Sequence, residues 1–191
     1  MTYGIDVSEH NIRVDWDAVA KAGQKFAIVR SSYGRYAKDA DFDQNVHGAH
    51  NAGLMCGAYH YSYALTPAQA REEARNCKKI IDEAGVLLEL PLFFDMEDAD
   101  RYKLNHGFDF SPENVTEICR AFLDEIKPLD CGVYASLSWL ESFIDWRSLG
   151  CAVWNAQWSD QDDIKGYMWQ YTDRLSIGGR TFDGNVIYLD L

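Results

Sequence analysis

Two acidic side chains that follow an apolar run are the residues of this chain best suited to chemistry. Leu90–Phe94 is a short apolar run bounded by polar residues, which is typical of a buried strand. Asp95 and Glu97 follow it two positions apart, so alternation would place them on one side, roughly 6–7 Å apart at Cα. Crowded, poorly solvated carboxyls have pKa values that are pushed apart. One protonated and one ionised carboxyl is the pair that acid-assisted cleavage of a glycosidic bond requires.

The same two carboxyls have plainer interpretations. A strand that runs out into solvent also ends in acidic residues, and paired carboxylates also bind metal ions. The Asp-x-Glu spacing is short and common, so it does not decide between these interpretations. The rest of the chain has to decide.

Composition narrows the class of protein. A chain of 191 residues favours one domain, and 47% hydrophobic and 25% charged residues are ordinary for a globular protein. The net charge of -12 argues against a nucleic-acid partner, because phosphate binding needs clustered Lys and Arg. Aromatic residues make up 14% of the chain, and they suit either a core or a groove on which sugar rings stack.

Several classes of site and location are not indicated. No apolar stretch approaches the roughly 18 residues of a membrane span, and residues 1–15 lack the pattern of a signal peptide. The five cysteines are scattered without C-x-x-C spacing, which favours buried thiols over disulfides or zinc ligands. The five histidines show no ligand spacing either. We therefore expect no metal ion and no cofactor.

Strand and helix patterns alternate along the chain. The predicted strands are Tyr3–Val7, Phe26–Ser31, Met55–Tyr61, Leu90–Phe94, Gly132–Ala135, Ala152–Ala156 and Tyr167–Gln170. The predicted helices are Trp16–Ala22, Phe42–Asn51, Pro67–Ala84, Pro112–Ile126 and Leu137–Phe143. Thr66-Pro67 and Ser111-Pro112 each supply an N-cap followed by proline at the first helical position.

This alternation predicts an α/β fold with a parallel sheet, either a (β/α) barrel or an open doubly wound sheet. No glycine-rich phosphate loop follows a strand, which weakens the nucleotide-binding option. In a barrel the active site lies at the carboxyl ends of the strands. The side chains expected there are mostly acids and aromatics: Asp6, Tyr61, Asp95, Glu97, Tyr134, Trp154, Gln157 and Trp169.

Fragments spread along most of the chain resemble glycoside hydrolase family 25, the Chalaropsis-type lysozymes. Each is weak alone, but their order and spacing are specific. The matching fragments are Tyr3–Ser8, Phe26–Arg30, Asp43–Asn45, Ala52–Leu54, Gly57–Tyr61, Phe94–Glu97, Gly132–Tyr134, Trp154–Trp158 and Trp169–Thr172.

The resemblance implies a single catalytic domain over residues 1–191, folded as an irregular (β/α) barrel with fewer than eight helices. It also implies four acidic site residues, in which Asp6 and Asp183 join Asp95 and Glu97. Read alone, without the resemblance, Asp6 would more often be a strand-end cap than a site residue. Asp183 lies in Phe182–Asn185, where glycine replaces the family's apolar residue, and Asp190 is a nearby competitor.

The activity implied is that of an N-acetylmuramidase, which cleaves the β-1,4 bond between N-acetylmuramic acid and N-acetylglucosamine in bacterial peptidoglycan. Glu97 would protonate the leaving oxygen, and Asp95 would orient the substrate's 2-acetamido group, with retention of configuration. Direct attack by Asp95, or inversion, stays open at this point. The aromatic and amide side chains expected to line the sugar groove are Tyr61, Tyr134, Trp154, Gln157 and Trp169.

Two other functions also remain open. One is a peptidoglycan- or glycan-binding module that has lost turnover, which would normally show as replacement of Asp95 or Glu97. The other is a chitin-directed N-acetylhexosaminidase on the same barrel. For the muramidase we expect a monomer that acts on the bacterial cell wall, outside the cell or after release on lysis.

Overall fold

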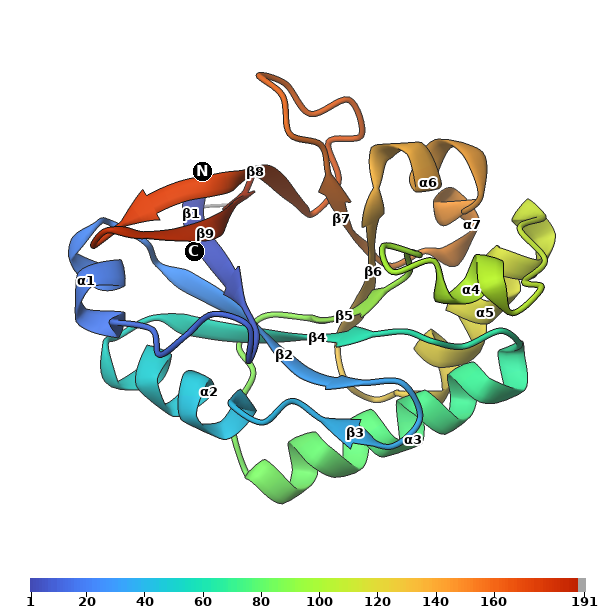
Figure 1. Ribbon diagram of the computed structural model, residues 1–191, viewed down its shortest axis with the longest axis horizontal. Helices are drawn as coiled ribbons and strands as arrows, with labels where there is room; N and C mark the ends of the chain where they lie inside the picture. The colour runs from blue at the N-terminus through green and yellow to red at the C-terminus, as the bar shows by residue number, and fades with distance from the viewer. Residues whose placement is uncertain (189–191) are drawn as a thin grey trace.

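The computed structural model describes residues 1–188, in which one mixed sheet closes on itself as a barrel (Figure 1). The strands are β1 (Thr2–Val7), β2 (Phe26–Tyr33), β3 (Ala37–Lys38), β4 (Met55–Tyr61), β5 (Leu92–Asp95), β6 (Cys131–Ser136), β7 (Ala152–Ala156), β8 (Met168–Ile177) and β9 (Arg180–Ile187). The barrel closes because β1 pairs with both β9 and β2, while β3 lies outside the ring as a short hairpin partner of β2. The predicted irregular α/β barrel is confirmed.

Strand β9 corrects the expectation of a purely parallel sheet. It runs antiparallel between β8 and β1, joined to β8 by a turn at Gly178 and Gly179, both at positive φ. The sequence analysis did not predict this strand, and it ended β8 at Gln170 rather than Ile177. Gly184 breaks the strand pattern of β9, but a Cβ there would lie 2.9 Å from the Tyr171 ring. Glycine therefore permits a close approach of β9 to β8.

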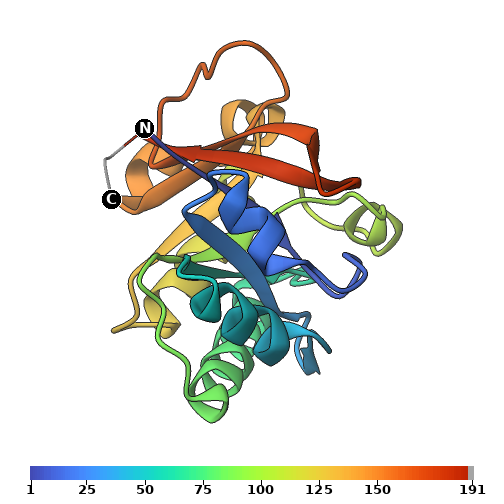
Figure 2. The ribbon, with the colours of Figure 1, turned by 90° about the vertical axis from the view of Figure 1, so that its left-hand side faces the viewer.

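Seven helices lie among the described residues, fewer than in a regular eight-fold barrel. They are α1 (Trp16–Lys21), α2 (Phe42–Asn51), α3 (Pro67–Ala84), α4 (Tyr102–Asn105), α5 (Pro112–Glu125), α6 (Leu137–Ser142) and α7 (Trp146–Leu149). Helices α2, α3 and α5 pack against strands β2, β4, β5 and β6, whereas the β8–β9 hairpin lies on the opposite side of the barrel (Figures 1 and 2). The four-residue helices α4 and α7 are too short to leave a periodic pattern, and they were not predicted.

The residues that begin and end the helices have capping geometry. Thr66 Oγ1 accepts from the Gln69 amide and Ser111 Oγ accepts from the Asn114 amide, so both predicted N-caps are confirmed. Gly85 ends α3 in the left-handed conformation, at φ 62°. The five cysteines are free thiols. Within residues 1–188, no helix is both long and apolar enough to cross a membrane.

The hydrophobic core has two parts because alternate strand residues face opposite ways. Ala27 and Val29 belong to the larger part, between the barrel and its helices. Phe26 and Ile28 belong to a smaller part inside the barrel, together with Phe93 and other residues. The interior below the carboxyl ends of the strands is thus filled by apolar side chains. Polar side chains that continue the same inward face have to sit at the mouth.

Candidate active site

Three strands bring the four predicted acids to one mouth of the barrel. Asp6 lies near the end of β1 and Asp95 ends β5, while Asp183 comes from the antiparallel β9. Asp6 and Asp183 are direct cross-strand partners. Such partners lie about 5 Å apart at Cβ, so two negative charges there repel each other. Asp190 lies outside the described residues.

Asp6 is buried and held by two amides. Its Oδ2 accepts hydrogen bonds from Gln170 Nε2 at 2.9 Å and from Asn185 Nδ2 at 2.7 Å. Burial, together with the charge of Asp183, raises the pKa of Asp6 to about 8 although both amides favour the ionised form. Burial and the charge of Asp173 raise the pKa of Asp183 to about 6. Asp6 therefore stores a proton at neutral pH.

Asp95 is the least compensated group of the site. It is 4% exposed, and its Oδ1 has no hydrogen-bond partner among residues 1–188. Burial and the nearby charge of Glu97 hold the pKa of Asp95 well above its usual range, although Lys103 and Arg30 oppose the shift. A buried carboxyl oxygen without an internal partner is costly, and Asp95 Oδ1 is free to accept a hydrogen bond from a water or a substrate.

Glu97 was predicted to continue the strand of Asp95, but β5 ends at Asp95. One further ladder bond, from Met96 N to Tyr134 O at 2.9 Å, keeps the segment against β6. Burial raises the pKa of Glu97; the charge of Lys103 acts against this, and the charge of Asp100 adds to it. The charge of Glu97 raises the pKa of Asp95, and the strand on which both were predicted to alternate ends at Asp95. One protonated and one ionised carboxyl remains a prediction.

Lys103 is a site residue that the sequence analysis missed. Only 1% of this α4 residue is exposed, yet its Nζ donates to the backbone oxygens of Ser62 and Glu97, the latter at 2.7 Å. Helix α4 is fixed by Asp98, whose Oδ1 accepts from the Lys103 amide at 2.7 Å. Lys103 thus joins the ends of β4 and β5 and places a positive charge beside Asp95 and Glu97.

The aromatic side chains divide into those at the mouth and those below it. Tyr61 and Tyr134 are the cross-strand neighbours of Asp95 on either side, and both are half-buried. Trp154 is only 1% exposed, packs edge-on against Tyr134 and donates through Nε1 to Asn185 Oδ1 at 2.9 Å. This buried ring offers no face to a sugar, which corrects the expectation that Trp154 lines the groove. Its contact orients Asn185, which in turn holds Asp6.

Gln157 and Trp169 support the loop after β7. Gln157 Nε2 donates to Asp163 Oδ2 at 2.6 Å, and Gln157 O accepts from Trp169 Nε1 at 2.7 Å. Both side chains are half-buried. Their polar groups hold this loop together, and a role for them in substrate binding remains a prediction.

A second missed residue, Trp158, presents an aromatic face beside the acids. Trp158 is 62% exposed, and its Nε1 donates a hydrogen bond to Gln170 Oε1 at 3.1 Å. The same Gln170 oxygen accepts from Tyr134 Oη at 3.2 Å, and its Nε2 binds Asp6. Gln170 therefore connects an exposed indole, a tyrosine and the buried acid of β1. The available sequence signal was the position of Trp158, which ends the fragment Trp154–Trp158 just after a predicted strand.

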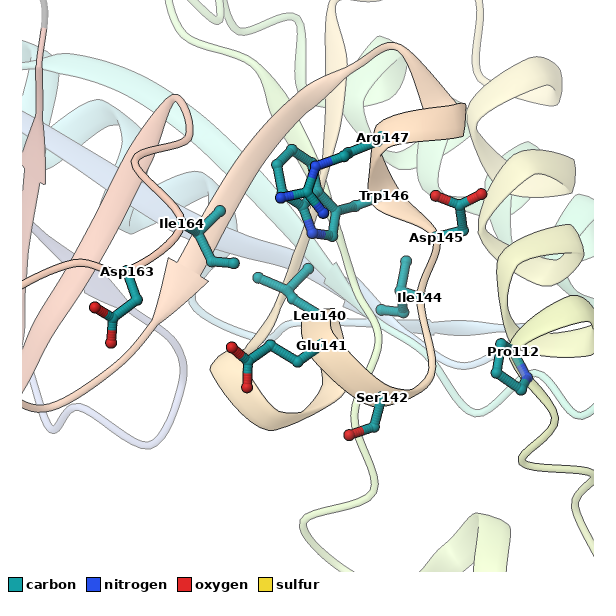
Figure 3. Close-up of a pocket in the computed structure, with 10 residues that line it drawn as sticks. All are labelled: Pro112, Leu140, Glu141, Ser142, Ile144, Asp145, Trp146, Arg147, Asp163 and Ile164. Carbon is teal, nitrogen blue, oxygen red and sulfur yellow. The ribbon is translucent and has the colours of Figure 1, made fainter.

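The four acids do not lie in the cavity between α6 and α7. That cavity has a volume of about 540 Å³ and lies between α6, α7 and the segment around Asp163 and Ile164 (Figure 3). In it the Arg147 guanidinium covers the Trp146 ring at 4.1 Å, and none of the four acids lines it. Among residues 1–188, no group of three His, Cys, Asp or Glu side chains is arranged to hold a metal ion.

An α/β barrel with clustered carboxyls at its mouth fits a glycoside hydrolase, a class in which a pair of carboxyls cleaves the glycosidic bond. The profile described as glycosyl hydrolases family 25 matches residues 5–180, and the chain belongs to that family.

Individual relatives agree with this assignment. The chain is 26% identical over 181 residues to the autolytic lysozyme of Clostridium acetobutylicum, which covers 92% of this chain and 52% of that protein. It is 41% identical over 59 residues to lysozyme M1 of Streptomyces globisporus, which covers 31% of this chain and 20% of that protein. The chain thus spans about half, or less, of the length of these curated relatives.

The fold is shared with solved structures. The modular autolysin LytC from Streptococcus pneumoniae superposes with a TM-score of 0.87 at 22% identity, which covers 98% of this chain and 46% of that chain. The muramidase from Trichobolus zukalii superposes with a TM-score of 0.79 at 20% identity, which covers 100% of this chain and 95% of that chain.

Proposed function

We propose that this chain is a lysozyme that hydrolyses bacterial peptidoglycan at the β-1,4 bond between N-acetylmuramic acid and N-acetylglucosamine. The observation that carries the proposal is the unpaired, buried Oδ1 of Asp95 beside the partly exposed Glu97. Family membership and the similarity to lysozymes and an autolysin support the choice of substrate. We further propose that residues 1–191 act as one monomeric catalytic unit on the cell wall, outside the cell or after release on lysis.

In the proposed mechanism Glu97 is the acid and Asp95 orients the substrate. Glu97 gives its proton to the glycosidic oxygen as the bond from that oxygen to the anomeric carbon breaks. The substrate's acetamido oxygen attacks the same carbon, and Asp95 accepts a hydrogen bond from the acetamido N–H as positive charge develops there. Glu97 then takes a proton from water, and the water oxygen replaces the acetamido oxygen with net retention. The other two acids and Lys103 set the charge around this pair.

The first test is digestion of purified peptidoglycan by the native chain and by Glu97→Gln, followed by reduction and mass analysis of the products. We expect new reducing ends on N-acetylmuramic acid, absent with Glu97→Gln. Reducing ends on N-acetylglucosamine, or cleavage of chitin alone, would favour the chitin-directed hexosaminidase. Glycan strands that bind but stay intact would leave only a binding module.

A second substrate separates the mechanisms. De-N-acetylated peptidoglycan lacks the acetamido oxygen that the mechanism uses as nucleophile, so its hydrolysis should fall about 1000-fold. The control is a re-acetylated sample of the same material, which should regain the original rate. Equal rates on both samples would contradict acetamido participation and favour direct attack by Asp95 or by water.

A further inference from the structure

A row of aromatic rings leads outward from the acids. Tyr61, the β4 neighbour of Asp95, contacts the Tyr63 ring at a centroid distance of 5.2 Å. Tyr63 contacts Tyr102 at 4.8 Å, and Tyr102 stacks on His106 at 4.0 Å. The row therefore runs from the end of β4 to helix α4, away from the bond-breaking pair. None of its rings beyond Tyr61 has a part in the mechanism above.

A cavity of about 360 Å³ lies beside this row, and three separate segments of the chain line it. Tyr36 comes from the β2–β3 hairpin, Tyr63 from the segment after β4, and Asp100 and Tyr102 from the segment after β5. All three segments follow the carboxyl ends of barrel strands, the end at which the acids lie. The cavity thus lies at the same end of the barrel as the proposed active site.

The walls of this cavity are held in place before any ligand arrives. Asp100 accepts from Tyr63 Oη through Oδ2 at 2.8 Å and from the Tyr102 amide through Oδ1 at 3.0 Å. Gly34, at φ 55°, bonds through its amide to Tyr61 O at 2.9 Å, and a Cβ there would lie 3.2 Å from the Tyr63 ring. Preorganised aromatic walls reduce the ordering cost of binding.

We propose that this cavity is a subsite for a neutral N-acetylhexosamine unit of the glycan strand, beyond the sugars that flank the cleaved bond. This inference rests on the proposed function, because a glycan strand is the substrate of that reaction. The sugar's apolar face would lie on Tyr102 or Tyr36, and its hydroxyls would meet the polar groups at the cavity edge.

The charges around the cavity favour a neutral sugar over an acidic stem peptide. Arg35 is the only cation lining it among the described residues, and its Nη1 already pairs with Glu72 at 3.3 Å. Its guanidinium also lies 5.5 Å from the centre of the Tyr36 ring. Asp100 lines the same cavity, in a protein of net charge -12. A peptide rich in carboxylates would be repelled here, whereas a sugar would not.

The test compares glycan strands of different length after an amidase has removed the stem peptides. Tyr36 is 79% exposed, so Tyr36→Ala should fold normally. We expect Tyr36→Ala and Tyr102→Ala each to raise KM for long strands about tenfold and to leave the shortest cleaved fragment unaffected. Tyr102→Phe keeps the ring and should behave as the native chain. Leu87→Ala, another exposed apolar residue at 67% exposure in a segment outside the cavity, is the control for surface truncation.

Binding measured without turnover separates this inference from the proposed function. In a Glu97→Gln background, calorimetric titration with a peptide-free glycan octasaccharide should show about tenfold weaker binding for Tyr36→Ala and Tyr102→Ala. Equal affinities and equal KM values for these variants and the native residues would overturn the subsite even if the native chain is an active lysozyme. A loss confined to strands that still carry stem peptides would also overturn it and assign the cavity to the peptide. An octasaccharide that binds through this cavity to a chain that cleaves no peptidoglycan would retain the subsite and remove the proposed function.

Discussion

Two clusters of buried ionisable side chains lie close together in this barrel and differ in how completely they are paired. The carboxyl cluster, inside the mouth, consists of Asp6, Asp95, Glu97 and Asp183. The histidine cluster, on the outer face of the strands, consists of Ser32, His60, Ser62 and Glu73, each 0% exposed. In the histidine cluster the hydrogen bonds run from Ser32 to His60 at 2.8 Å, from His60 to Glu73 at 3.2 Å and from Ser62 to Glu73 at 2.7 Å.

Ser32, His60 and Glu73 are hydrogen-bonded in the order of a Ser–His–Glu catalytic triad. Unlike the members of such a triad, they are fully buried and no substrate can reach them. His60 stacks on Phe122 at 5.3 Å, within the helix-facing core. Burial opposes the imidazolium, but contacts with Cys77 and Glu73 outweigh it and raise the pKa of His60 to about 9. Its charge is therefore satisfied inside the protein. The carboxyl cluster, by contrast, leaves Asp95 Oδ1 unpaired and the carboxyl pKa values raised. The two clusters therefore differ in how far their buried charges are compensated inside the protein.

The largest expected effect comes from neutralising the unpaired group. Asp95→Asn should lower peptidoglycan hydrolysis about 1000-fold, since an amide cannot ionise to stabilise the positive charge that develops on the acetamido group. The free energy of unfolding at pH 7 should not fall, because no internal hydrogen bond of Oδ1 is lost. Turbidity assays and urea titrations measure the two quantities. Asp17→Asn, at an exposed position on α1, should change both very little.

The second prediction breaks the paired cluster instead. Glu73→Gln should lower the free energy of unfolding by about 3 kcal/mol, because the buried imidazolium loses its counter-charge. The rate per folded molecule should stay within about threefold of the native value. Glu72→Gln is the matched control on the same helix, since Glu72 forms a partly exposed ion pair with Arg35 worth less than about 1 kcal/mol. Comparable losses in both variants would erase the distinction between the clusters.

The paired and unpaired clusters also differ in how far the sequence predicted them. Asp95 and Glu97 were found from local pattern, because an apolar run and two acids lie in one short stretch. Gln170 and Asn185, which hold Asp6, lie 164 and 179 positions away from it in the chain. Only barrel closure by β9 brings them together. A single sequence contains no local signal for such contacts.

Polar residues at the candidate site interrupt the hydrophobic patterns from which strands are predicted. Strand β9 carries Asp183 and Asn185 on its inward face, with Gly184 between them, so the apolar alternation that marks a strand is missing there. Lys103 gives no local signal of its position, because lysines are rarely buried. Trp154 lies on the same strand face as residues of the mouth. Strand alternation predicts which face a side chain occupies, but it does not predict how deep in the barrel that side chain lies. By contrast, the ends of β4, β7, α2 and α3 were predicted to the residue, since caps and apolar periodicity are local.

The third prediction concerns pH and stability. Asp6 binds its proton up to about pH 8 in the folded state and to about 3.8 when unfolded, so stability is lost as pH rises between these values. Between pH 5 and 6 this loss should be about 1 kcal/mol. His60 adds a loss only between about pH 6.5 and 9. Melting temperatures of Asp6→Asn should therefore be less dependent on pH than those of the native chain below pH 6.5. Above pH 6.5, the melting temperatures of Asp6→Asn and of the native chain should both decline. If the two plots of melting temperature against pH were parallel over the whole range, Asp6 would not hold a proton in the folded state.

The smallest expected effect lies where the two clusters meet, at Lys103. Its charge interacts with Glu73 on one side and with Asp95 and Glu97 on the other, and it lowers the pKa of Asp95 and of Glu97. Removing the charge in Lys103→Met should raise the pKa of the general acid further. The alkaline limb of the pH–rate profile should then move up by about one unit, because Glu97 keeps its proton to higher pH. Lys103→Arg keeps the charge and should keep the limb in place, whatever either variant does to stability. A limb that moves equally in both variants would mean that Lys103 acts through its hydrogen bonds to Ser62 and Glu97 and not through its charge.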